Sequence, residues 1–181
     1  MYFSKSKLNE SIKWAINKPN ITGPLKLKKN MELEERNWGN HILGKNNSGQ
    51  WSNLLGEKLI HDVLKNNGEN PVRPKRKSGF QPDWETDTHI YEVKTSNWCV
   101  NGTAGEKVLG TWIKYQDIPK IYGKPLRIIC IANQEYELEY GKINYFGDNI
   151  SDKNKQILQL AKSWGIEYIK FSDLIKTINC K

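Results

Sequence analysis

The sequence predicts an α/β domain in which a mixed β-sheet is flanked by helices on both sides. Three observations support this class. A helical stripe of apolar residues precedes several short extended segments between residues 70 and 95. The apolar run Leu126–Ala132 is typical of a central strand that is covered on both faces. Further helical and extended segments alternate after this run, and 181 residues suffice for one domain with a substantial core.

The N-terminal segment, residues 1–48, has weak periodicity. Residues that break helices divide it, namely Pro19, Gly23, Pro24, Gly39 and Gly44. We expect one short helix there, at Lys7–Asn17, with Leu8 and Ile12 on its apolar face.

The next helix is expected to begin after Ser52, a favourable N-cap residue, and to end at Asn66-Asn67-Gly68. Its apolar residues recur at helical spacing: Leu54, Leu55, Leu59, Ile60, Val63 and Leu64. Extended segments follow at 70–75, 81–85 and 89–95. Turn residues separate them, so we predict an antiparallel meander.

A helix is expected within Thr103–Tyr122, interrupted or ended near Pro119 and Gly123, because proline lacks the N–H group that a helix interior requires. The strand at 126–132 follows it directly.

The C-terminal part is expected to contain a helix, a strand and a short final helix. Ser151-Asp152 can cap the first helix, which ends at Ser163. Its inward residues are predicted to be Ile157, Leu158, Leu160 and Ala161. The strand is expected at Glu167–Phe171, and Ser172-Asp173 starts the final helix.

Two motifs with chemical meaning lie on successive extended segments, Pro82-Asp83 and Glu92-Val93-Lys94. Alternation in a strand puts Glu92 and Lys94 on one face, while Val93 points to the other. If the segment of Asp83 pairs beside that strand, two carboxylates and one ammonium group meet. Such oxygen ligands suit Mg²⁺, with Mn²⁺ as a substitute, and this combination is suited to hydrolysis of a phosphodiester.

The same residues have simpler interpretations. Asp83 is also typical of a turn after a proline, and Glu92 and Lys94 can form a solvated pair of charges on a strand.

Composition favours a polyanionic partner and excludes several classes of protein. The net charge of +8 and the pI of 9.3 favour nucleic acid, although solubility alone is the alternative. Neither a transmembrane run nor the apolar core of a signal peptide is present, so we expect a cytoplasmic protein without membrane contact. Cys99, Cys130 and Cys180 have neither disulfide nor zinc spacing. Gly102–Lys107 is not a P-loop, so no use of ATP is expected.

The order of elements and the two motifs resemble the PD-(D/E)XK nuclease superfamily, also called the restriction-endonuclease-like fold. The resemblance covers roughly residues 50–135, and residues 1–48 have no counterpart in it.

The resemblance implies roles for individual residues. Asp83 and Glu92 would bind Mg²⁺, and the carbonyl of Val93 would be a further ligand. Lys94 would orient the attacking water and stabilise charge on the scissile phosphate. Glu57, on the helix before the sheet, would face the metal, and its alternative is an exposed helix position.

Basic and polar residues near these motifs are candidates for DNA contact. Lys75-Arg76-Lys77 is expected to meet the DNA backbone, or alternatively to be a solvated hairpin tip. The candidates after the catalytic strand are Asn97, Asn101, Thr103, Lys107 and Lys114. For these we favour contact with the DNA backbone over contact with bases, and the alternative is an ordinary polar loop.

The resemblance implies a type II restriction endonuclease that cuts double-stranded DNA in a sequence-specific manner, as part of a restriction-modification system. One active site per chain predicts a homodimer for double-strand cleavage. Residues 1–48 would then serve recognition or dimerisation, 50–135 would form the catalytic core, and 136–181 would close the single nuclease domain. The alternatives are a homing endonuclease, a Holliday-junction resolvase, and a DNA-binding module of this fold without catalysis.

Overall fold

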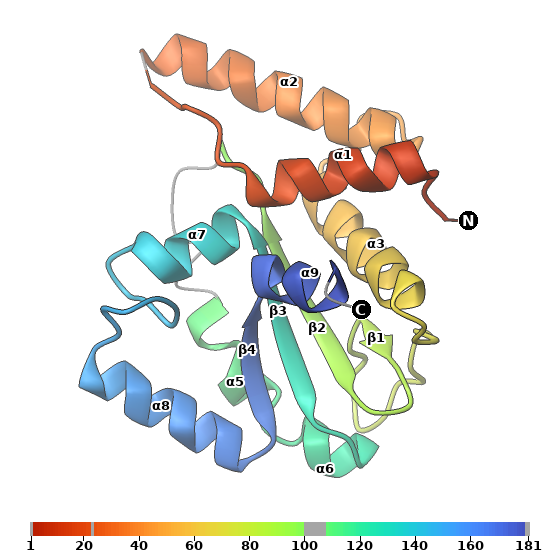
Figure 1. The fold of residues 1–181 in the computed structure, drawn as a ribbon, viewed down its shortest axis with the longest axis vertical. Coiled ribbons are helices and arrows are strands. Elements are labelled where there is room, and N and C mark those ends of the chain that lie inside the picture. Colours follow the sequence, from red (N-terminus) through yellow and green to blue (C-terminus); the bar gives the residue numbers. More distant parts are fainter. Residues whose placement is uncertain (1, 23, 100–107, 180–181) are drawn as a thin grey trace.

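A computed structural model of the chain describes residues 2–22, 24–99 and 108–179. Within these residues, one mixed sheet contains four strands in the order β1 (Trp84–Glu85), β2 (Ile90–Ser96), β3 (Leu126–Ala132) and β4 (Ile166–Lys170) (Figure 1). β1 is antiparallel to β2, whereas β2, β3 and β4 are parallel. The predicted α/β class is therefore confirmed.

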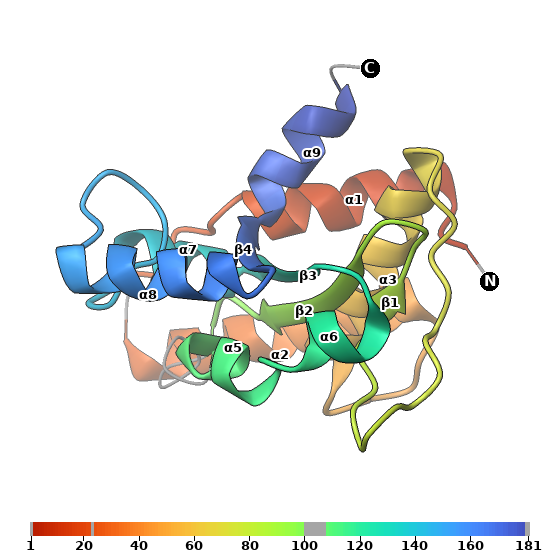
Figure 2. The ribbon, with the colours of Figure 1, turned by 90° about the horizontal axis from the view of Figure 1, so that it is seen from below.

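Helices lie on both sides of the sheet. One side contacts α1 (Lys5–Ile16), α3 (Trp51–Asn66) and α9 (Phe171–Asn179), and the other contacts α5 (Thr111–Lys114), α6 (Ile118–Tyr122) and α8 (Asp152–Ser163). Figure 2 shows α1 and α9 on one side and α5 and α6 on the other. α2 (Leu25–Leu43) packs against α3, and α7 (Asn133–Tyr140) follows β3. No helix in the described ranges has both the length and the apolar composition needed to cross a bilayer.

Side chains of β2 alternate between the two sides. Tyr91 and Val93 belong to the core cluster under α1, α3 and α9, whereas Ile90 belongs to the cluster under α5, α6 and α8. Because alternate residues of a strand share a face, Glu92 and Lys94 project on the same side as Ile90.

Several predicted elements are confirmed closely. β3 occupies the predicted residues and lies between two parallel neighbours. α8 begins after Ser151, whose hydroxyl accepts a hydrogen bond from the backbone N–H of Asn154 at 3.2 Å, and it ends at Ser163. α3 ends at the predicted Asn-Asn-Gly sequence, and α1 lies within two residues of its predicted bounds.

The N-terminal segment contains a helix that the sequence did not predict. Pro24 and Gly44 were expected to break helical structure, but they lie at the two ends of the 19-residue helix α2. Gly44 has a left-handed conformation, with φ of 65°, and ends the helix as glycine commonly does. Gly39 lies inside the helix, and the ring of Trp51 occupies the space that a side chain at this position would need.

Other predictions for the first half need correction. α3 begins at Trp51, so Ser52 is inside the helix, and Gln50 at the N-cap makes no side-chain capping bond. The expected three-stranded meander is reduced, because segment 70–75 pairs only through an isolated bridge between Val72 and Glu85. β1 and β2 form the remaining antiparallel pair.

The second half also differs in three places. Residues 103–107 of the expected helix lie outside the described residues. The rest contains the short helices α5 and α6, with Pro119 in the first turn of α6. Leu160 is 45% exposed and does not point inward. α7 was not predicted, because its sequence lacks an apolar stripe and only Leu138 among its apolar residues is buried.

Gly39→Ala is expected to lower the free energy of unfolding by about 1–3 kcal/mol, because the added methyl group overlaps the buried Trp51 ring. The gain in helix propensity offsets only part of this loss. Chemical denaturation measures the difference. Gly49→Ala is the control, since a Cβ at that position meets open space. Equal stability of both variants would contradict the role assigned to Gly39.

Candidate active site

Asp83 lies directly before β1 and beside the Glu92-Val93-Lys94 motif of β2. In the β1–β2 register, Trp84 is opposite Tyr91, which places Asp83 next to Glu92. The backbone N–H of Asp83 donates to the carbonyl of Tyr91 at 3.1 Å. Its carboxylate Oδ2 accepts the backbone N–H of Val93 at 2.7 Å. The side chain of Asp83 thus takes the place of a backbone acceptor just before β1 begins.

Glu92 is held by a cation and a phenol. Lys94 Nζ lies 2.6 Å from Glu92 Oε1, and the carboxylate also accepts a hydrogen bond from the hydroxyl of Tyr115. Glu92 is only 5% exposed, while the side chain of Lys94 is 28% exposed. This pair is therefore not the solvated pair of strand charges that the simpler interpretation required.

Glu57 joins the cluster through an arginine. Arg73 Nη1 lies 3.0 Å from Glu57 Oε2 and 3.6 Å from Asp83 Oδ1, and it also donates to the carbonyl of Asp83 at 3.3 Å. Trp84 Nε1 donates to the backbone carbonyl of Glu57 at 2.8 Å, which fastens α3 to β1. Glu57 is therefore connected to Asp83 and is not an isolated surface position.

The carboxylates crowd one another. The pKa of Asp83 is raised to about 7, first by burial and then by the negative charges of Glu92 and Glu57, against the opposing effects of the Val93 N–H and of Lys94. The carboxyl groups of Asp83, Glu92 and Glu57 share only two neighbouring cations among the described ion pairs, Lys94 and Arg73. Such a site favours binding of a proton or of a metal cation.

The donor atoms fit a hard divalent cation. Among the described His, Cys, Asp and Glu side chains, no group of three or more is arranged as a metal site. Mg²⁺ commonly needs only one or two protein carboxylates, since waters and substrate oxygens complete its shell. Asp83 and Glu92 are the carboxylates that would hold it, with Val93 between Glu92 and Lys94 as the expected carbonyl donor.

The Lys75-Arg76-Lys77 segment is exposed and forms one side of a tight turn. Lys77 and Phe80 exchange backbone hydrogen bonds across Ser78 and Gly79, both of which have positive φ. The hydroxyl of Tyr122 donates to the Lys75 carbonyl at 2.8 Å and connects this turn to α6. The position agrees with the predicted hairpin tip, and DNA contact stays a prediction.

The predicted DNA-contacting residues after β2 differ in where they lie in the structure. Lys114 is exposed on α5, with its Nζ 4.8 Å from the ring centroid of Tyr115. Asn101, Thr103 and Lys107 lie outside the described residues.

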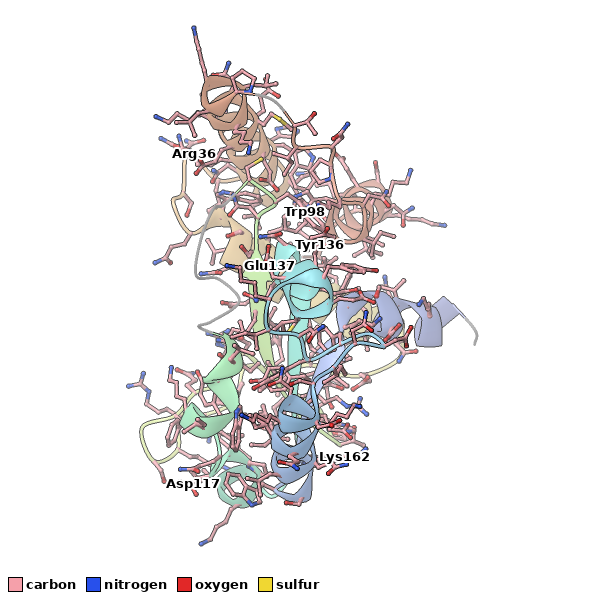
Figure 3. All side chains as sticks on the ribbon, turned by 90° about the vertical axis from the view of Figure 1, so that its left-hand side faces the viewer. Arg36, Trp98, Asp117, Tyr136, Glu137 and Lys162 are labelled. Atoms are coloured by element: carbon pink, nitrogen blue, oxygen red, sulfur yellow. The ribbon has the colours of Figure 1, made fainter. Side chains whose placement is uncertain are left out.

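The expectation for Asn97 needs correction, because this residue is only 8% exposed and its side-chain amide donates to Glu35 Oε2 at 3.4 Å. The backbone N–H of Trp98 also donates to Glu35, at 2.9 Å, and Trp98 packs 6.2 Å from Tyr136 of α7 (Figure 3). Asn97 therefore helps attach the end of β2 to α2, and we do not retain it as a DNA contact.

Two residues of the cluster, Arg73 and Tyr115, were not identified from the sequence. Arg73 is one of four arginines in a lysine-rich chain, which was the only local signal available. Tyr115 has no pattern that would connect it to Glu92, since 23 positions separate the two. Both depend on contacts between distant segments.

We compared the chain with protein families, curated proteins and solved structures. No family model, curated protein or solved structure matches it.

Proposed function

We propose that this protein is a Mg²⁺-dependent endonuclease of the restriction-endonuclease-like fold that hydrolyses phosphodiester bonds in double-stranded DNA. The observation that supports it most is the meeting of Asp83, Glu92 and Lys94. Asp83 binds the backbone between the other two, and Lys94 forms an ion pair with Glu92. Two carboxylates and a lysine on adjacent strands are the arrangement that the sequence resemblance implied.

Each side chain has a chemical task in this proposal. When bound, Mg²⁺ supplies a Lewis acid that offsets phosphate charge and lowers the pKa of water. Asp83 and Glu92 hold the cation. Lys94 is partly exposed beside Glu92, where it orients water and stabilises negative charge that develops on the phosphate. Tyr115 and Arg73 keep Glu92 and Asp83 in position by their hydrogen bonds.

The choice of DNA as substrate rests on charge. The chain carries a net charge of +8, and exposed basic residues lie in the 75–77 turn, a few residues before Asp83, and at Lys114, next to Tyr115. Binding of such a surface to phosphates releases counterions, so we expect affinity to fall steeply with salt. Within this proposal, the chain acts as a type II restriction endonuclease and as a homodimer, because two strands require two active sites.

The test is cleavage of a plasmid of known sequence with Mg²⁺, and in parallel with EDTA. We expect discrete fragments with Mg²⁺ or Mn²⁺ and intact plasmid with EDTA. Mapping of the ends then identifies the recognition site and the position of the cut. Binding of DNA without cleavage in any divalent metal would contradict the proposal and would indicate a non-catalytic DNA-binding module. Preference for four-way junctions over linear duplex would indicate a resolvase.

A further inference from the structure

The outer face of α2 is exposed along its length. We use this name for Lys26, Leu27, Asn30, Leu33, Glu34 and Asn37, which recur at intervals of three and four and are all exposed. Leu27 and Leu33 have 45% and 47% of their surface accessible. The opposite side of α2 contains the buried Gly39 and Ile42 and packs toward Trp51. This face thus presents two leucines, each with nearly half of its surface open to solvent in the described protein.

On this face, residues at equal distances before and after Asn30 match in type, except that the charged pair has opposite signs. Lys26 lies four residues before Asn30 and Glu34 lies four residues after it, while Leu27 and Leu33 lie three residues to either side. In an antiparallel pair of identical helices centred on Asn30, each of these residues is opposite its counterpart. Leucine then meets leucine, and lysine meets glutamate twice. A parallel pair would instead put each lysine and each glutamate against its own copy.

We propose that the outer face of α2 is a docking surface for a second copy of this chain, in an antiparallel, two-fold symmetric arrangement. The four leucines supply apolar contact, since burial of exposed apolar surface drives association. The pairing of Lys26 with Glu34 selects the direction of the docking more than it strengthens it. The role of this surface as the interface of a nuclease homodimer rests on the proposed function. The pairing of two chains through α2 does not depend on it.

The first experiment measures the mass of the full chain in solution by light scattering, without DNA and without metal. We expect about twice the chain mass of 21.0 kDa for the wild type at high micromolar concentration. Leu33→Asp is expected to give a monomer, because the dimer would bury its carboxylate. Leu160→Asp is the matched control, since Leu160 is 45% exposed on α8, and this variant should remain a dimer. Circular dichroism should show that both variants are folded.

A monomeric wild type, or a dimeric Leu33→Asp variant, would overturn the proposal. Neither result decides whether the protein is a nuclease, because DNA cleavage is measured separately.

The second experiment tests the direction of the pairing by charge exchange. Lys26→Glu alone and Glu34→Lys alone should each weaken self-association at least about tenfold, because like charges then face each other twice. A mixture of the two variants should form a heterodimer with affinity near that of the wild type, since every pair is again of opposite sign. Failure of the mixture to associate would exclude the antiparallel arrangement even if the wild type is a dimer.

Discussion

Lys94→Ala and Asp83→Ala are each expected to reduce cleavage of double-stranded DNA by about a thousandfold or more, with DNA affinity changed less than about tenfold. Lys94 supplies the only ammonium group that lies against Glu92 among the described contacts, and Asp83 is the carboxylate fixed between Glu92 and Lys94 by the Val93 N–H. Under the proposed function, affinity should persist because it is spread over many basic residues, whereas hydrolysis would depend on this cluster.

Variants that preserve structure separate a catalytic loss from a loss of folding. Lys94→Gln keeps a hydrogen-bond donor for the buried Glu92 but removes the positive charge, so it should be as inactive as Lys94→Ala. Lys124→Ala is the matched control, because Lys124 forms an ion pair with Glu85 at 2.7 Å and its side chain is 26% exposed, similar to Lys94. Cleavage kinetics give the rate of hydrolysis, and a filter-binding assay gives the affinity for DNA. Near-normal cleavage by Asp83→Ala or by Lys94→Gln would remove the catalytic assignment.

Asp83→Asn is expected to stabilise the protein near neutral pH. The pKa of Asp83 is about 7 in the native protein and 3.8 in the unfolded chain, so between these values the native state holds more protons. The free energy of unfolding of the wild type therefore falls as pH rises from about 4 to about 7 and then levels off. Asparagine does not ionise, so the variant avoids this loss. Its free energy of unfolding should exceed that of the wild type by about 2–4 kcal/mol at about pH 8.

The difference in stability between Asp83→Asn and the wild type should depend on pH, because Asp83 is protonated in both the native and the unfolded state below about pH 4. Denaturant titrations of the two proteins across this range should show the difference shrinking toward low pH. A constant difference at all pH values would contradict the raised pKa of Asp83. Glu135, whose pKa is also raised by burial, contributes equally to both proteins and cancels in the comparison.

Mg²⁺ should act on the same carboxylate. A cation that binds only the native state stabilises it in proportion to the logarithm of its concentration over its dissociation constant. At about pH 8 we expect Mg²⁺ to raise the melting temperature of the wild type and to leave that of Asp83→Asn nearly unchanged. The effect should weaken below about pH 7, where a proton competes for Asp83. Equal stabilisation of both proteins would place the metal elsewhere.

Much of the fold could be predicted because local patterns determine it. A run of consecutive apolar residues is compatible with burial on both faces, and β3 is indeed the strand with parallel neighbours on each side. A serine directly before a helix can accept a hydrogen bond from an unpaired N–H group of the first turn, and Ser151 accepts one from Asn154 as predicted. Strand alternation likewise predicted that Glu92 and Lys94 share a face.

The unpredicted elements have a common cause. Gly39 looks like a helix breaker by itself, and only the ring of Trp51 shows why a helix requires glycine there. α7 has no apolar stripe, so its helical state depends on its position after β3 and on the burial of Leu138. In both cases packing against another part of the chain outweighs local propensity.

The sequence by itself predicted that Asp83, Glu92 and Lys94 meet, because their two motifs are separated by few residues and belong to neighbouring extended segments. Only the tertiary structure decided that Arg73 connects Glu57 to Asp83, that Tyr115 binds Glu92, and that Asn97 faces inward. Strand periodicity is a property of a few consecutive residues, whereas these contacts join segments whose approach depends on the packing of the whole core.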